Sequence, residues 1–167
     1  MRYFYRLAEG IRVLPMMAAI ARQPGLWNED QMRQKFDQSP HSQVDDILLR
    51  FGAPGEDVGH DLEAVDRPAM RALPNVKDEV LNVMRAVSGA RLGRVIITRL
   101  EAGKKIAPHA DTQGEYAKYY TRYHLVLQGL PGSLFICGDE TVCMQTGELW
   151  WFDASAEHSV VNNSKDD

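Results

Sequence analysis

The sequence predicts a mainly β fold with flanking helices (α+β), and three observations support that class. From Leu92 onward, apolar residues recur with a period of two, which is the spacing of half-buried strands. Seven short segments of this kind are joined by turn sequences, a pattern typical of an antiparallel double sheet or barrel and not of a parallel α/β sheet. Before that point, the clearest patterns have the spacing of helices.

The first third of the chain supplies a short strand, a helix and a buried strand. Residues 3–5 predict a strand, and apolar residues at helical spacing predict a helix near residues 11–22, with Pro15 close to its first turn. Residues 46–51 are mostly apolar, so they predict a strand that is buried on both faces.

The polar stretch from residue 28 to residue 61 is punctuated by glycine and proline, which predicts loops. It carries His41, His60 and Asp61. We expect these side chains to face substrate or solvent rather than to bind a metal, because polar residues gather in loops in any case. The stretch is our candidate for a substrate-facing flap.

A second helix is the clearest helical prediction. Asn75 is a good N-cap, and an apolar stripe runs from Val76 to Val87. Gly89 stands where the helix is expected to end. One apolar stripe beside charged residues predicts a helix that packs on the outside of a sheet as scaffold.

The second half of the chain contains the seven predicted strands. Turn sequences such as residues 101–103, 130–132 and 138–139 set their limits. The strands are expected at residues 93–100, 104–109, 119–128, 133–137, 141–144, 149–152 and 158–161.

Composition is that of an ordinary globular protein. The chain has 167 residues, of which 44% are hydrophobic and 25% are charged, enough for one domain with a sizeable core. A net charge of −4 gives no general electrostatic reason for binding nucleic acid or an anionic membrane. The longest apolar-rich stretch, residues 13–21, is far too short for a membrane span and has no signal-peptide layout.

The only two cysteines, Cys137 and Cys143, flank a predicted turn and have no framework spacing. Such thiols fit a reducing compartment, so we expect them to be small structural residues and the protein to be cytoplasmic. A cysteine-based metal site would need more ligands than these two provide.

His109, Asp111 and His158 are the candidate metal ligands and catalytic residues. If the strand that leads into His109 continues, residues i and i+2 project from one face, so His109 and Asp111 share a side. His158 is distant in sequence and has to arrive through the fold. Two imidazoles and one carboxylate on one face of an octahedron leave positions open for oxygen and a co-substrate, which indicates a non-haem Fe(II) oxygenase.

A His-x-Asp sequence by itself is weak evidence, since it occurs often by chance. The alternative is a surface histidine beside a turn aspartate, together with a core histidine that bonds a backbone carbonyl. The context favours the metal interpretation: strand-like sequence precedes His109, further strands precede His158, and Arg122 and His124 lie between them.

Arg122 and His124 share one face of the strand predicted at residues 119–128, and both are costly to bury without partners. A guanidinium suits a carboxylate ligand, but the same face could be exposed to solvent, as antiparallel sheets allow. Thr98, a hydroxyl among aliphatic residues, could bond a ligand or a backbone group.

Residues 92–167 resemble the aspartyl/asparaginyl β-hydroxylase-like group of non-haem Fe(II)/2-oxoglutarate-dependent oxygenases. The matching pieces agree with that group in order and spacing, which makes them far more specific than His-x-Asp alone. They are Thr98, Pro108-His109, Arg122-x-His124-Leu125, Gly147-Glu148-Leu149-x-x-Phe152-Asp153 and Glu157-His158.

The resemblance implies a double-stranded β-helix (jelly-roll, cupin-like) core with iron on His109 and His158. It also implies cofactor-binding contacts near Thr98, Arg122 and His124, the cofactors being Fe(II) and the co-substrate 2-oxoglutarate.

The activity implied is that of a 2-oxoglutarate-dependent dioxygenase, which hydroxylates an amino-acid, peptide or other small substrate while O2 is consumed and succinate and CO2 are released. Because Asp111 is present, the chain resembles members with a full triad, and hydroxylation is expected rather than halogenation. The alternative is a cupin-like binding or structural protein with a vestigial metal site.

Members of the group also carry an arginine about ten residues after the distal histidine, where it pairs with 2-oxoglutarate. Counted from His158, that position falls one past the last residue. From the length of the chain we expect a single oxygenase domain over residues 1–167. In it, residues 1–91 provide helical support and substrate-side loops, and residues 92–167 form a jelly-roll core that lacks its last strand.

Overall fold

The computed structural model describes residues 1–53, 63–112 and 119–166, and the chain forms two compact units. The β unit comprises residues 1–13, 32–44 and 99–167, and the mixed unit comprises residues 14–31 and 45–98. His60 and Asp61, two of the loop residues considered above, lie outside the described residues. The single domain over the whole chain stays a prediction.

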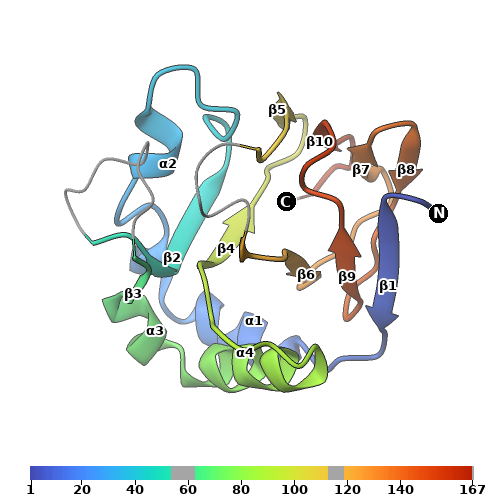
Figure 1. Cartoon of the computed structure of the whole chain (residues 1–167). Coiled ribbons are helices and arrows are strands. Elements are labelled where there is room, and N and C mark those ends of the chain that lie inside the picture. The colour runs from blue at the N-terminus through green and yellow to red at the C-terminus, as the bar shows by residue number, and fades with distance from the viewer. Residues whose placement is uncertain (54–62, 113–118, 167) are drawn as a thin grey trace. The chain divides into compact units, whose positions relative to one another are not determined.

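The mixed unit combines helices with one small sheet (Figure 1). Its helices are α1 (Leu14–Ala21), the 3-10 helix η1 (Pro24–Leu26), α3 (Pro68–Ala72) and α4 (Pro74–Ala86). Its sheet has the order β3-β2-β4, with β2 at Asp45–Phe51, β3 at Val65–Asp66 and β4 at Val95–Arg99. Residues 46–49 of β2 are all buried, which confirms a strand that is covered on both faces.

Helix α4 differs from its prediction at its start and in its packing. Pro74 occupies the first turn and Leu73 the capping position, with no side-chain cap, so the N-cap predicted at Asn75 is wrong. Proline is preorganised for the first helical position, which explains the earlier start. The helix packs against α1 and α3, and Val76 is its one buried residue, whereas the sequence predicted packing on a sheet.

The β unit contains two antiparallel sheets and the short helix α2 (Met32–Lys35). One sheet has the order β1-β9-β6, with β1 at Phe4–Ala8, β9 at Leu149–Phe152 and β6 at Tyr123–Leu125. The other has the order β5-β10-β7-β8, with β5 at Lys105–His109, β10 at His158–Asn162, β7 at Ser133–Cys137 and β8 at Glu140–Val142.

All seven strands predicted after residue 92 are present, but the one predicted at residues 119–128 is much shorter. Strand β6 covers only Tyr123–Leu125 and pairs with Trp151, Trp150 and Leu149. Its partner β9 is four residues long, so there is little backbone for a longer strand to pair with. Arg122 consequently lies just outside the strand.

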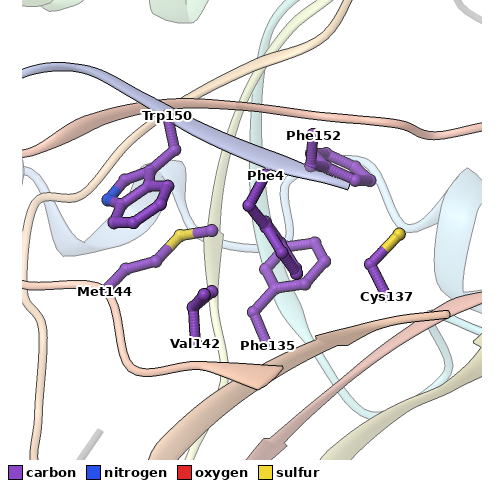
Figure 2. Packing of buried hydrophobic residues seen from close by; sticks show 7 residues of the cluster. All are labelled: Phe4, Phe135, Cys137, Val142, Met144, Trp150 and Phe152. Carbon is purple, nitrogen blue, oxygen red and sulfur yellow. The ribbon is translucent and has the colours of Figure 1, made fainter. Parts of the chain in front are cut away.

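An aromatic cluster from both sheets forms the core of the β unit (Figure 2). Phe4 of β1 meets Phe135 of β7 edge to face, with ring centroids 5.5 Å apart. Phe135 also lies 4.8 Å from Phe152 of β9, so strands of the two sheets are joined by ring contacts. The remaining buried members of the cluster are Cys137, Val142, Met144 and Trp150.

His124 borders this core. Its ring centroid lies 4.8 Å from that of Phe152 and 5.2 Å from that of Phe135. Burial lowers the pKa of His124 to about 4, and Arg122 and His158 act in the same direction. The folded chain therefore keeps this imidazole neutral at pH values where an exposed histidine takes up a proton.

Along residues 1–53, 63–112 and 119–166, every helix is too short or too polar to cross a bilayer.

Replacing Phe4 with alanine is expected to lower the free energy of unfolding by about 3–5 kcal/mol, because the ring is 1% exposed and its loss leaves a cavity in the core. Leu7→Ala, on the same strand but 48% exposed, is the matched control and should change that free energy by less than about 1 kcal/mol. Urea unfolding measures both variants, and equal losses would contradict the assigned core.

The second prediction concerns the stability of the folded chain at acid pH. Below pH 6.5 the unfolded chain binds a proton at His124 that the folded chain does not bind until about pH 4, so stability falls as the pH falls. Between these two pH values, His124 changes the free energy of unfolding by up to about 1.4 kcal/mol per pH unit, the amount expected for one proton. The variant His124→Phe should show a pH dependence of unfolding that is shallower by about this amount. Parallel curves for the two proteins in urea titrations would rule the assignment out.

Candidate metal centre

The pairing of β5 with β10 brings two of the predicted ligands together. His109 and His158 are direct partners in the register of these antiparallel strands, so their side chains lie on the same face of the sheet. Their ring centroids are 4.3 Å apart. Sequence alternation alone could not provide this contact, because it depends on how two distant strands align.

A bulge in β5 shapes the end of this pairing. His158 pairs with His109 and Val160 pairs with Ile106, so three steps along β5 match two along β10. The extra residue falls in the stretch that contains Pro108, which has no N–H to donate to a ladder. Bulges re-aim side chains, and here one lies immediately before a candidate ligand.

Asp111 reaches the centre in a different way from the one that the sequence predicted. Strand β5 ends at His109, so the spacing of i and i+2 along a strand does not position Asp111. Its backbone N–H instead donates to the carbonyl of Ala154 at 2.8 Å, which ties it to the connection between β9 and β10. The side chains of His109 and Asp111 do approach each other, but not through the alternation of a strand, as the sequence predicted.

The three side chains converge. One donor atom from each of His109, Asp111 and His158 lies within 4.8 Å of the other two. Nε2 of His158 is 3.5 Å from Oδ2 of Asp111, and Nε2 of His109 is 4.0 Å from Oδ1. All three side chains are largely buried, at 15%, 18% and 5% exposed for His109, Asp111 and His158.

Backbone carbonyls orient both imidazoles. Nδ1 of His109 is 2.8 Å from the carbonyl of Ala107, and Nδ1 of His158 is 3.0 Å from the carbonyl of Ala156. Because a carbonyl only accepts, each Nδ1 carries the proton and each Nε2 keeps a lone pair. Ligand histidines are commonly held in this way, with the outer ring nitrogen bonded to a carbonyl.

The donor atoms fit a metal ion. Nε2 of His109 and Oδ2 of Asp111 are buried, and neither has a hydrogen-bond partner among the described residues. Two neutral imidazole nitrogens and one carboxylate form the donor set that suits Fe(II) in oxygenases. The alternative of a surface histidine beside a turn aspartate does not describe this arrangement.

Arg122 lies beside the same carboxylate. Its Nη1 is 2.6 Å from Oδ2 of Asp111, close enough for an ion pair but without the alignment of a hydrogen bond. The guanidinium is 38% exposed, so part of it stays accessible to a ligand. Arg122 is thus brought to the centre, and its role toward a cofactor stays a prediction.

Burial also affects His158 electrostatically. Desolvation lowers its pKa from the ordinary value, and the positive charges nearby act in the same direction, while Asp111 and the bond to Ala156 oppose them. The neutral imidazole is the form that binds a metal. Low exposure therefore favours the ligand state of His158.

His41 packs against the centre. Its ring lies edge to face with that of His109, with centroids 5.0 Å apart. Burial lowers the pKa of His41 to about 2, and Arg33, His109, Arg122 and His158 act in the same direction. It does not belong to the convergent donor group found in the described part of the chain.

A cavity of about 160 Å³ adjoins the centre. Asp111, Arg122, Trp151, Asp153 and Ser155 are among the residues that line it. It therefore combines a cation, a second carboxylate, a hydroxyl and an aromatic ring in a small space.

The other predicted residues have different surroundings. His124 packs between Phe135 and Phe152, and its role toward a cofactor stays a prediction. Thr98 belongs to the mixed unit, where its hydroxyl donates to Oδ1 of Asp46 at 2.7 Å. That bond helps to satisfy a carboxylate that is 1% exposed, and the role of Thr98 in cofactor binding also stays a prediction.

The two cysteines are free, as predicted. Cys137 of β7 is the register partner of His158 on the other side of β10, and its Sγ donates to the carbonyl of Asp153 at 3.4 Å. Burial raises the pKa of the Cys137 thiol to about 11, with the negative charges of Asp153 and Glu140 contributing.

Known proteins resemble this chain in sequence. The model of the aspartyl/asparaginyl beta-hydroxylase family matches residues 52–167. L-proline cis-4-hydroxylase of Rhizobium meliloti (strain 1021) is 32% identical over 118 residues, which are 70% of this chain and 41% of that protein. L-proline cis-3-hydroxylase 1 of Streptomyces sp is 35% identical over 78 residues, 45% of this chain and 26% of that protein. The chain spans less than half the length of these curated relatives.

A solved structure resembles it as well. An oxidoreductase of the 2OG-Fe(II) oxygenase family from Burkholderia pseudomallei aligns with a TM-score of 0.51 and 14% identity, over 86% of this chain and 70% of that chain. At this identity the likeness concerns the fold, and it confirms the mainly β architecture with a jelly-roll core and flanking helices. Since the family model covers well over half of the sequence, this chain belongs to the aspartyl/asparaginyl beta-hydroxylase family.

Proposed function

We propose that this protein is an Fe(II)- and 2-oxoglutarate-dependent oxygenase that hydroxylates a small substrate and releases succinate and CO2. The observation that carries the proposal is the convergence of His109, Asp111 and His158 in a buried site, where Nε2 of His109 and Oδ2 of Asp111 have no hydrogen-bond partner among the described residues. Family membership supports it. We further propose that residues 1–167 act as one oxygenase domain. We also propose that the protein is cytoplasmic, which its two free thiols support.

In this proposal His109, Asp111 and His158 bind the iron. When bound, iron and 2-oxoglutarate supply the oxidising chemistry: O2 is consumed and one oxygen atom enters a C–H bond of the substrate. The carbonyls of Ala107 and Ala156 hold the imidazoles in the tautomer that a metal needs. The aromatic core beside His158 excludes water from that side of the centre.

Arg122 is proposed to bind a carboxylate of the co-substrate or of the substrate. It is a guanidinium beside the candidate metal ligand Asp111, and it lines the cavity. A fixed, planar cation with several donors suits a carboxylate. Thr98 and His124 are proposed as further contacts to the cofactor, as the resemblance described above implies.

The substrate is proposed to be a free amino acid. The cavity of about 160 Å³ is smaller than the roughly 300–1,000 Å³ of most ligand sites, which favours a small molecule. Arg122 offers a positive charge, and Asp153 offers a negative one whose pKa is held below its ordinary value by the Ser155 hydroxyl and backbone bonds. Opposite charges across a small cavity complement the carboxylate and ammonium groups of an amino acid. Both curated relatives are named as proline hydroxylases, so L-proline is the first compound to test.

The variants His109→Ala and Asp111→Ala are expected to abolish iron-dependent formation of succinate, because each removes one of three ligands. They should also lose the visible charge-transfer band that Fe(II) and 2-oxoglutarate give without oxygen. Asp139→Ala, at an exposed hairpin position, is the matched control and should keep both signals. Turnover that persists in either ligand variant would end the assignment.

The proposed substrate is tested by Asp153→Asn, which keeps an oxygen for the Ser155 bonds but removes the negative charge. Binding of L-proline should weaken by about tenfold or more, as expected for the loss of a charged hydrogen bond. Calorimetric titration measures this change, and 2-oxoglutarate should bind as in the wild type. N-acetyl-L-proline, which lacks the ammonium, is the comparison ligand. Equal weakening of both compounds would contradict an ammonium contact at Asp153.

A further inference from the structure

A short segment before β2 covers the outer edge of β5. Strand β5 is the first in its sheet order, so its other side faces no strand in the described parts of the chain. The N–H of Ala107 donates to the carbonyl of Pro40 at 3.1 Å, and the N–H of Lys105 donates to Oε1 of Gln43 at 3.0 Å. These two bonds satisfy the edge beside the bulge and fix residues 40–43 next to the candidate ligand His109.

His41 lies between these two attachment points. Its ring meets that of His109 at 82°, with centroids 5.0 Å apart. It is not a member of the donor group formed by His109, Asp111 and His158 among the described residues. The segment therefore adds a further imidazole beside the metal ligands without adding a ligand.

The Nδ1 atom of His41 is buried and has no hydrogen-bond partner in residues 1–53, 63–112 and 119–166. Such an atom destabilises a folded chain unless something pairs with it. Nε2 of His109, which the metal is proposed to bind, is likewise buried without a hydrogen-bond partner among the described residues. A polar atom left unpaired beside a site is explained if the ligand of that site is its partner.

The charges around His41 indicate the kind of group that would pair with it. The positive charges of Arg33 and Arg122 both act on this ring, and the imidazoles of His109 and His158 are close enough to do so. Such surroundings favour an anionic group over a cationic one. A carboxylate meets that requirement and accepts from an N–H.

We propose that Nδ1 of His41 donates a hydrogen bond to a carboxylate oxygen of the small molecule bound at the metal centre. The inference rests on the proposed function, since the carboxylate belongs either to 2-oxoglutarate or to the substrate. It assigns a specific binding role to a residue that the sequence analysis expected only to face substrate or solvent.

Two variants separate this role from simple packing. His41→Phe keeps an aromatic ring against His109 but removes Nδ1. His41→Asn removes the ring but places an amide group at the same number of bonds from the backbone as Nδ1. Ser42→Ala, at the exposed neighbouring position, is the matched control.

The measurements are the dissociation constants of Mn(II) alone, of 2-oxoglutarate and of L-proline, taken without oxygen. His41→Phe should weaken one of the two carboxylate compounds by about tenfold while leaving Mn(II) binding within about twofold, and His41→Asn should recover most of the loss. The compound that weakens identifies the source of the carboxylate. Because the phenyl ring removes a buried unpaired atom, His41→Phe should melt no lower than the wild type.

Two results would overturn the role proposed for His41 while leaving the oxygenase assignment in place. In one, His41→Phe binds both carboxylate compounds as tightly as the wild type. In the other, Mn(II) binding weakens in His41→Phe, which would make the residue a positioning group for His109. A wild-type chain that binds Mn(II) but neither carboxylate compound would instead refute the proposed function together with this inference.

Discussion

The alignment of β10 against β5 is the constraint on which the candidate centre depends. It sets His158 directly opposite His109, and a shift of one residue would turn one imidazole to the other face of the sheet. The aromatic core supports this alignment, because Phe135 and Phe152 contact the ring of His158. The packing that stabilises the β unit thus also fixes the spacing of the two nitrogen donors.

The candidate ligands of the centre stand on two kinds of backbone: the histidines on strands and Asp111 outside them. The histidines stand on strands at positions where ladder bonds and carbonyl contacts restrict their rings. Asp111 lies beyond the end of β5 and is tied by one backbone bond to Ala154. Loops tolerate change better than strands do, so the carboxylate is the candidate ligand whose position is the more adjustable. Arg122 pairs with that same ligand.

Most of the β architecture was predictable because its signals are local. Alternating apolar residues and turns such as residues 138–139 marked all seven strands after residue 92, and the Cys137–Glu140 pairing confirms that hairpin. The extent of β6 was not predictable, since it depends on the length of a partner strand. The start of α4 was missed because a proline at its first position outweighed the capping preference of Asn75. The ligand types could be read from the sequence, but the edge attachment that brings His41 to His109 arises from tertiary bonds to Ala107 and Lys105.

The burial of Cys137 affects the reactivity of its thiol. It is fully buried one strand away from His158, and its thiol stays protonated because burial and nearby carboxylates raise its pKa. The thiolate is the form that reacts with peroxide and related oxidants, so a sulfur atom held as the thiol is slow to enter the series from sulfenic to sulfonic acid. The strand next to the centre can therefore carry a compact, polarisable side chain there that oxidants attack only slowly.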